Sequence, residues 1–206
     1  MAGLLTSVTN AARRLRYGDP IVVVSGLPRS GTSMMMRMLD TAGLDLVTDA
    51  IRQPDEDNPH SYYEFEPVKR LHEAADKAWL LDCRGRVIKI VSFFLRDLPA
   101  THDYRVIFMR RDLREVLASQ RVMLERRGEP ADVDDAHLER LYRSHLGETE
   151  RLLSRARHLR AIEIPHRQCL DDPLAQARRV ADFLGRSLPV SRMAGAVDPM
   201  LHRNRA

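Results

Sequence analysis

The sequence predicts an α/β protein with a single three-layer α/β/α domain around a mainly parallel sheet. Short apolar runs rich in β-branched residues, which are typical of buried strands, alternate with longer segments of helical periodicity. The 206 residues are enough for one domain with a sizeable core and would be cramped as two. No internal repeat or low-complexity linker divides the chain, so we expect one domain over residues 1–206.

Four strands and five helices are expected in alternation. The strand patterns lie at residues 21–25, 87–91, 104–109 and 161–164. The helical patterns lie at residues 31–42, 65–81, 113–126, 134–159 and 173–184. The last helix has the clearest ends, because Asp172 is a good N-cap, Pro173 suits the first helical position and Gly185 is a stop signal.

Four segments fall outside this alternation. Residues 1–18 predict an N-terminal helix or arm, and residues 186–206 predict a basic C-terminal tail. The polar segment 49–63 follows the first helix, and the segment 127–132 links two long helices. Ligands of open parallel sheets bind outside the carboxyl ends of the strands. We therefore expect the segment 49–63 to cover the site as a lid.

The composition narrows the possible functions. There are 33 basic and 29 acidic residues, and the excess is dispersed through the helices, so we expect no nucleic-acid partner. Two cysteines and eight scattered histidines form no set with metal-ligand spacing, so no metal site is expected. No apolar run approaches a membrane span and no signal pattern begins the chain, so we expect a cytoplasmic protein without membrane insertion.

The most informative segment is the turn that follows the first strand, Gly-Leu-Pro-Arg-Ser-Gly-Thr-Ser at residues 26–33. A glycine-rich turn between a buried strand and a helix places backbone N–H groups at the helix N-terminus, where they bind phosphate or sulfate groups. The spacing is that of a P-loop, so the fold is expected to be P-loop NTPase-like, although Thr32 stands where that motif has lysine. The residues expected to bind the anion are Gly26, Pro28, Arg29, Ser30, Gly31, Thr32 and Ser33.

The chain also lacks a clear set of Mg²⁺ ligands. Arg29 is the only cation in the loop, and the strand at 104–109 ends in Arg110-Arg111 instead of an aspartate. Such a site suits a donor whose transferred group needs no metal clamp. A P-loop kinase or nucleotide hydrolase that uses ATP or GTP with Mg²⁺ is an alternative, and so is a catalytically inactive nucleotide-binding relative.

The loop resembles the 5′-phosphosulfate loop of sulfotransferases that use 3′-phosphoadenosine 5′-phosphosulfate (PAPS). With Arg29 it is most similar to the tyrosylprotein and bacterial branches of that family. Farther along, Arg111 and Ser119 resemble the pair that binds the donor's 3′-phosphate. Arg111 can offer a forked donor and Ser119 a hydroxyl from about two turns into the helix, whereas strand alternation should turn Arg110 the other way.

Two weaker matches keep the order of the family. Lys89 stands inside an apolar strand, like the lysine-bearing strand of cytosolic sulfotransferases, and a buried ammonium should meet an anion or a carboxylate. The segment 162–173 and the Phe-Leu-Gly at 183–185 are similar to the family's closing segment, with His166 in place of the usual tyrosine. Together the matches span residues 21–185.

The resemblance implies that the sulfuryl group of PAPS moves to a hydroxyl or amine acceptor, leaving adenosine 3′,5′-bisphosphate (PAP), without a metal. Arg29 and the loop N–H groups would stabilise charge on the departing oxygen, and Lys89 could contact that oxygen or the transferred group. An alcohol acceptor also needs a base. The candidates for this base are Asp49 first, then Glu64 and Glu66, with His60 a distant last.

The acceptor itself stays open among carbohydrates, peptide tyrosine, small phenols and lipid head groups, and so does the oligomeric state. An apolar acceptor pocket could be formed by Tyr62, Tyr63, Phe93 and Phe94. Aromatic residues at such places are nevertheless more often plain core.

Overall fold

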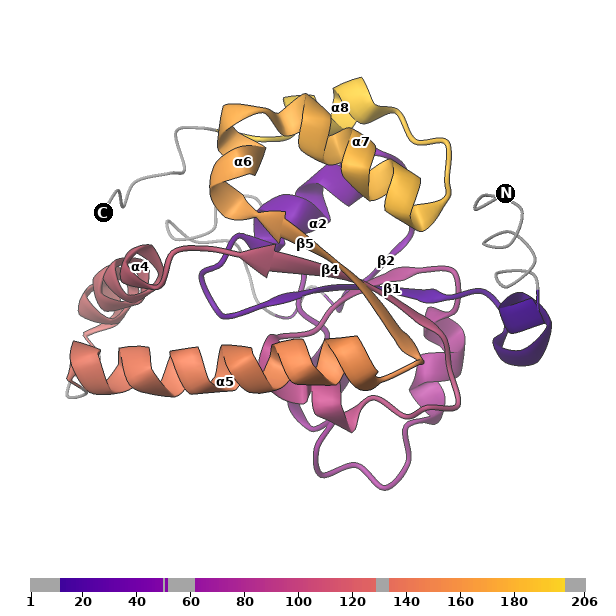
Figure 1. Ribbon diagram of the computed structural model, residues 1–206, viewed down its shortest axis with the longest axis horizontal. Coiled ribbons are helices and arrows are strands. Elements are labelled where there is room, and N and C mark those ends of the chain that lie inside the picture. The colour runs from indigo at the N-terminus through magenta and orange to yellow at the C-terminus, as the bar shows by residue number, and fades with distance from the viewer. Residues whose placement is uncertain (1–11, 50, 52–61, 129–133, 199–206) are drawn as a thin grey trace.

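Five parallel strands form one sheet in the order β2-β3-β1-β4-β5 (Figure 1). The structure is a computed structural model and describes residues 12–49, 51, 62–128 and 134–198. The strands are β1 Ile21–Gly26, β2 Leu46–Val47, β3 Val87–Lys89, β4 Tyr104–Arg110 and β5 Leu159–Pro165. The predicted α/β class with a parallel sheet is thereby confirmed. Strand β2 is an addition to the four expected strands.

Helices cover both faces of the sheet (Figure 1). One face carries α2 Thr32–Thr41, α6 His166–Asp171, α7 Pro173–Leu184 and α8 Val190–Gly195. The other face carries α3 Glu66–Lys69, α4 Leu113–Arg127, α5 Asp135–Arg155 and the 3-10 helices η1 Ala78–Cys83 and η2 Ser92–Asp97. The three layers of the prediction are therefore present, with a separate apolar core on each side of the sheet.

Strand β1 is buried along its whole length because it lies between β3 and β4. Its side chains alternate between the two cores: Ile21 and Val23 face the core beneath α5, whereas Val22 and Val24 face the core beneath α2. A strand covered on both faces needs a continuous apolar sequence, which explains why residues 21–24 have no polar side chain.

The sequence signals at the ends of α7 work as expected. Asp172 accepts a hydrogen bond from the amide of Ala175 at 2.9 Å, and Pro173 occupies the first turn. The helix stops at Gly185, whose φ of 63° is left-handed. Asp112 and Asp134 cap α4 and α5 in the same way.

The expected helix at 65–81 is wrong. Only α3 and the later η1 are helical there, and turns separate them. Leu71 and Leu80 are both fully buried in the same core, yet nine residues are about two and a half turns, so one continuous helix would turn them to opposite sides. Asp76 assists the break by accepting a hydrogen bond from the amide of Ala78 at 2.8 Å.

Two further expectations need correction. The helix expected at 134–159 ends at Arg155, because Leu159 already pairs with Tyr104 as the first residue of β5. The region expected to be a C-terminal tail, 186–206, contains α8, in which Met193 is fully buried against the core of α2 and α7. At the other end of the chain, residues 12–17 are helical, as expected for part of the segment 1–18.

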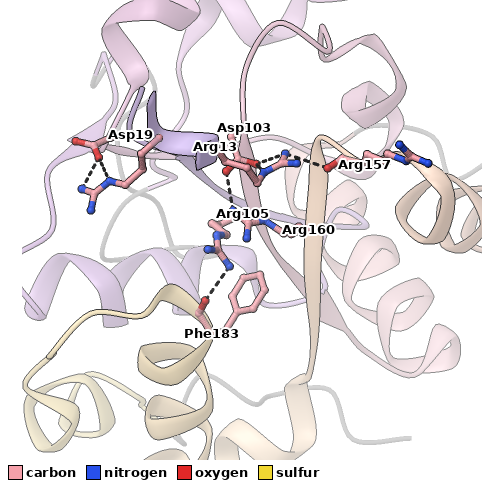
Figure 2. Close-up of polar contacts among 8 residues, drawn as sticks. Arg13, Asp19, Asp103, Arg105, Arg157, Arg160 and Phe183 are labelled. Carbon is pink, nitrogen blue, oxygen red and sulfur yellow. Dashed lines mark hydrogen bonds and ion pairs between the residues drawn. The ribbon is translucent and has the colours of Figure 1, made fainter. Parts of the chain in front are cut away.

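A cluster of charges lies at the amino ends of β4 and β5 (Figure 2). The side chain of Asp103 is 2% exposed and accepts hydrogen bonds from Arg13 at 2.6 Å and Arg160 at 2.7 Å. Arg13 also donates to the carbonyl oxygen of Arg157 at 3.0 Å. These contacts hold residues 12–17 against the amino edge of the sheet, the edge opposite to the loop that follows β1.

Candidate functional site

The loop at 27–31 leaves the carboxyl end of β1, where the order of the chain through the sheet changes direction. Strands β2 and β3 follow on one side of β1, and β4 and β5 follow on the other. In open parallel sheets this switch point is the usual place for a ligand. The segment predicted to bind an anion therefore lies at the position that the topology favours.

The loop is compact and needs glycine at Gly26. Its φ is 146°, and a Cβ atom there would lie 2.6 Å from the carbonyl oxygen of Met109 on β4. Within the loop, the hydroxyl of Ser30 donates to the carbonyl oxygen of Leu27 at 2.7 Å, and Arg29 has a φ of 67°. The turn is thus fixed from inside and by the neighbouring strand.

Helix α2 begins directly after the loop with uncapped N–H groups. Its N-cap residue is Gly31, which has a φ of 96° and, as a glycine, no side chain that could cap the helix. The first intrahelical hydrogen bond runs from the amide of Met35 to the carbonyl of Gly31 at 3.2 Å, so the amides of Thr32 and Met34 have no partner within the helix. No acidic residue stands in this first turn. The helix dipole and these donors favour an anion here.

The two sequence motifs meet in space. The Arg29 Nε donates to the hydroxyl of Ser119 on α4 at 3.0 Å. The Arg111 Nη1 donates to the carbonyl oxygen of Arg29 at 3.0 Å. Residues that are 82 and 90 positions apart in the sequence are thereby brought into one polar cluster beside the loop.

Arg111 is held by a residue that the sequence reasoning missed. Its Nε forms an ion pair with Glu115 at 2.8 Å, and both side chains are mostly buried, at 9% and 13% exposure. The available signal was the spacing of four residues, which places Glu115 one turn into α4 beside the arginine. Arg110 turns away, as strand alternation predicts, and pairs with Glu150 of α5 at 2.8 Å.

Lys89 points to the start of α2. It lies on β3 opposite Val24 of β1, and its Nζ is 3.2 Å from the hydroxyl of Ser33 and 2.7 Å from the carbonyl oxygen of Tyr62. The ammonium therefore contacts the first turn of α2. The contact of Lys89 with the carbonyl oxygen of Tyr62 could not be predicted from the sequence, because any residue has a backbone carbonyl.

The carboxylates proposed as bases already have structural partners. Asp49 accepts hydrogen bonds from the amide of Glu66 at 2.5 Å and from the amide of Ile51 at 3.1 Å. Glu64 and Glu66 lie 3.7 Å and 2.8 Å from the ammonium of Lys69. His60 and most of the expected lid at 49–63 lie outside the described residues.

The aromatic residues expected in an acceptor pocket do not act as one group. Tyr62 and Tyr63 are buried, and Tyr63 belongs to the core beneath α2. Phe94 packs against the opposite core. Phe93 alone among these four has a large exposed fraction, 38%.

His166 completes the wall of the loop. It is the first residue of α6, directly after β5, and is buried. A Cβ atom at Gly31 would lie 2.5 Å from its Cδ2, so the ring packs directly against the loop. His166, which stands where the resemblance led us to expect tyrosine, is therefore next to the loop after β1, with imidazole as the contacting ring.

Comparisons with solved structures identify the fold. A sulfotransferase from Alicyclobacillus acidocaldarius matches with a TM-score of 0.51 and 16% identity, over 82% of this chain and 81% of that one. The sulfotransferase domain of a Synechococcus olefin synthase matches with a TM-score of 0.52 and 15% identity, over 89% and 78%. A Mycobacterium avium sulfotransferase gives 0.53 and 14%, over 92% and 71%. The chain therefore has the fold of these sulfotransferases, as its motifs predict.

Sequence comparisons add nothing to this result, because no protein-family profile and no curated protein matches the chain. Within the described residues, no group of three or more histidine, cysteine, aspartate or glutamate side chains is placed to hold a metal ion. No helix in the same part of the chain is long and apolar enough to cross a membrane.

Proposed function

We propose that this chain, which has the fold of sulfotransferases, moves the sulfuryl group of PAPS to a hydroxyl or amine acceptor. The observation that carries the proposal is the meeting of two motifs beside the loop. Arg29 contacts Ser119 and Arg111 contacts Arg29, each at 3.0 Å. One doubly phosphorylated adenosine could therefore bind the loop after β1 and the segment that carries Arg111 and Ser119 at the same time.

The residues present fit such a donor. Because Gly26 has no side chain, the loop can lie directly against β4. The amides of Thr32 and Met34 at the start of α2, where no side chain caps the helix, suit the 5′-phosphosulfate. Arg111 and Ser119 offer a guanidinium and a hydroxyl for the 3′-phosphate. Glu115 keeps the guanidinium of Arg111 oriented through their 2.8 Å ion pair.

The donor supplies an activated sulfuryl group, and the chain supplies charge stabilisation and orientation. Arg29 and the amides at the start of α2 would hold the negative charge that develops on the departing oxygen. Lys89, already 3.2 Å from Ser33, would add a second cation on the side of β3. Because charge builds up only as the bond breaks, these groups act most strongly on the transition state.

A ligand-binding measurement tests this proposal. PAP without Mg²⁺ should raise the melting temperature of the protein in calorimetric scans. A ligand present at about 100 times its Kd stabilises the folded state by about 2.7 kcal/mol. A shift that requires ATP together with Mg²⁺, and is absent with PAP, would instead support the P-loop kinase or hydrolase.

Arginine variants test the assigned roles. Arg29→Ala should lower kcat by about 100-fold or more, as the loss of a transition-state donor does. Arg111→Ala should weaken PAP binding by about 10- to 100-fold, through loss of a charged hydrogen bond. Arg110→Ala is the matched control, because Arg110 pairs with Glu150 away from the loop, and it should leave both quantities unchanged. Equal turnover by Arg29→Ala and wild type would overturn the mechanism.

A further inference from the structure

A histidine that the sequence reasoning did not single out lies near the carboxyl end of β3. The Nε2 of His145, on α5, is 2.8 Å from the hydroxyl of Ser92 and 3.4 Å from that of Thr149. Ser92 is buried and stands three residues after Lys89, at the start of η2. The imidazole is therefore held in one orientation by groups close to the lysine of the proposed site.

The surroundings of His145 are apolar and partly open. The ring of Phe93 stacks on the imidazole with centroids 4.0 Å apart and planes at 19°. Phe93 is 38% exposed, and Leu141, one turn earlier on α5, is 51% exposed. These are two of the five large apolar side chains that the described residues expose. Phe93, Leu141 and His145 therefore form one surface, in which the first two residues are the apolar part and His145 is the polar part.

The same surface is connected to the residues proposed for the 3′-phosphate. Tyr142, three residues before His145, donates from its hydroxyl to Gln120 on α4 at 2.8 Å. Gln120 directly follows Ser119, whose hydroxyl accepts from Arg29. Helix α5, which carries His145, thus contacts both η2, which follows the strand of Lys89, and α4, which carries Ser119.

The protonation state of His145 suits a base. Burial lowers the pKa of His145 from 6.5, Glu148 on the same helix opposes this shift, and Arg96 of η2 adds to it. The shift favours the neutral imidazole over the imidazolium. Thr149 donates its hydroxyl proton to the carbonyl oxygen of His145, so toward Nε2 it can only accept, which favours the tautomer with the proton on Nε2. In that tautomer Ser92 accepts from Nε2 and the lone pair is on Nδ1, which makes no hydrogen bond within the described residues.

We infer that this surface is the acceptor subsite and that His145 is the general base, which rests on the proposed function. The acceptor would be an alcohol or phenol with an apolar or aromatic body, lying on Phe93 and Leu141 with its hydroxyl toward His145. A carbohydrate, whose surface is polar on most sides, would gain little from these side chains.

The step balances without a further reagent. The acceptor hydroxyl gives its proton to Nδ1 of His145, and its oxygen forms the new bond to sulfur. The bond from sulfur to the bridging oxygen of PAPS breaks, and PAP leaves with that electron pair. The imidazolium then returns its proton to solvent. Asp49 and Glu64 are less suited, because Asp49 accepts two backbone hydrogen bonds and Glu64 lies near Lys69.

The test combines two acceptors with a base variant. Wild type should sulfate 2-naphthol with a kcat/KM at least 100-fold above that for glucose. His145→Ala should lower kcat with 2-naphthol by about 100- to 10,000-fold and leave the Kd for PAP unchanged within twofold. Added imidazole should restore part of the lost rate. His137→Ala, an exposed histidine on the same helix, is the control.

The pH profile adds a readout that a structural role would not give. Since the neutral imidazole is the active form, wild-type kcat should fall as the pH drops below 6.5, and His145→Ala should lose this acid limb. Phe93→Ala should raise the KM for 2-naphthol more than tenfold, whereas Leu81→Ala, another exposed apolar residue, should not.

Each outcome decides between separate claims. If PAP binds but His145→Ala keeps kcat within threefold, the base assignment is overturned while the proposed function stands. Equal use of glucose and 2-naphthol overturns the acceptor class. If wild type does not bind PAP, the proposed function fails, and this inference fails with it.

Discussion

At the scale of single residues, the close approach of β4 to Gly26 decides which side chains the start of the loop after β1 can accommodate. Gly26 and Gly43 both have left-handed φ values, 146° and 81°. A Cβ atom at Gly26 would meet Met109, whereas nothing lies within 4 Å of one at Gly43. Comparing substitutions at Gly26 and Gly43 therefore separates two contributions to the loss of stability, one from the left-handed φ and one from a steric clash.

This difference gives a stability prediction. Gly43→Ala should cost about 1 kcal/mol, the typical cost of a left-handed backbone for an L-residue. Gly26→Ala should cost at least about 1–3 kcal/mol more, because the loop or β4 must also move. Urea unfolding of the two variants measures both values. Equal costs at the two positions would show that the contact with Met109 does not constrain the loop.

The two cysteines lead to a prediction about reactivity. Burial raises the pKa of Cys83 to about 11 and that of Cys169 to about 12, and both side chains are at most 1% exposed. Because the thiolate is the reactive form, neither should be modified by a thiol reagent at pH 8 while the protein is folded. Mass spectrometry after brief labelling should find no adduct in buffer and two adducts in urea. One fast adduct in buffer would contradict the packing around that cysteine.

At the scale of elements, local capping can be separated from nearby charge. Asp172 caps α7 by accepting from Ala175, whereas Asp171 forms an exposed ion pair with Arg167. Asp172→Ala should lower the free energy of unfolding by about 1 kcal/mol. Asp171→Ala should change it by less than about 0.5 kcal/mol. Thermal unfolding of the two variants checks the prediction, and a larger loss from Asp171→Ala would contradict the assigned cap.

The elements that the sequence predicts best are those with local signals. Helix α7 has its cap, its proline and its terminal glycine in the sequence, and its observed bounds equal the expected ones. Strand β1 is also recognisable, because a strand buried on both faces is continuously apolar. In both cases the determining interactions lie within a few residues of each other.

Elsewhere, distant contacts override the local pattern. The helix expected at 65–81 breaks because Leu71 and Leu80 must both reach one core. The end of α5 is set by pairing of Leu159 with Tyr104, 55 residues earlier. These constraints come from the sheet and have no local signature in the sequence.

The candidate site shows the same division. The loop residues could be proposed from their spacing, since strand, turn and helix follow each other directly, and Arg111 from the resemblance of its segment to a 3′-phosphate-binding motif. The contacts of Arg29 with Ser119 and of Lys89 with Tyr62 could not, because they join segments 90 and 27 positions apart. His145 was missed for this reason: its relation to Ser92 spans 53 positions and two different elements.

At the scale of the whole molecule, one carboxylate links the N-terminal helical segment to the sheet. Asp103 binds Arg13 and Arg160, and Arg105 beside it donates to the carbonyl oxygen of Phe183 at 3.3 Å (Figure 2). The hydrogen bond that Arg13 donates to Asp103 raises the pKa of the Arg13 guanidinium, so it stays charged. The guanidinium groups of Arg13 and Arg160 therefore share this single counter-charge.

Removing that carboxylate should be costly. Asp103→Ala should destabilise the protein by about 2–3 kcal/mol, below the value for a fully buried pair because both arginines keep about a quarter of their surface exposed. Asp19→Ala, which removes an exposed pair with Arg14, should cost less than about 1 kcal/mol. Denaturant titrations measure the free energy of unfolding of both variants. Similar losses would mean that the cluster contributes no more than a surface pair.

The anchoring of residues 12–17 at the amino edge of the sheet has a practical consequence. Leu15 is 91% exposed there, and β1, at about 3.3 Å per residue, separates this edge from the anion loop by roughly 20 Å. Since both native thiols are buried, a cysteine introduced at Leu15 offers one selective attachment point. A sensor chip coupled through it would hold the protein with the loop after β1 facing the solution, and a fluorophore there would stay clear of that loop.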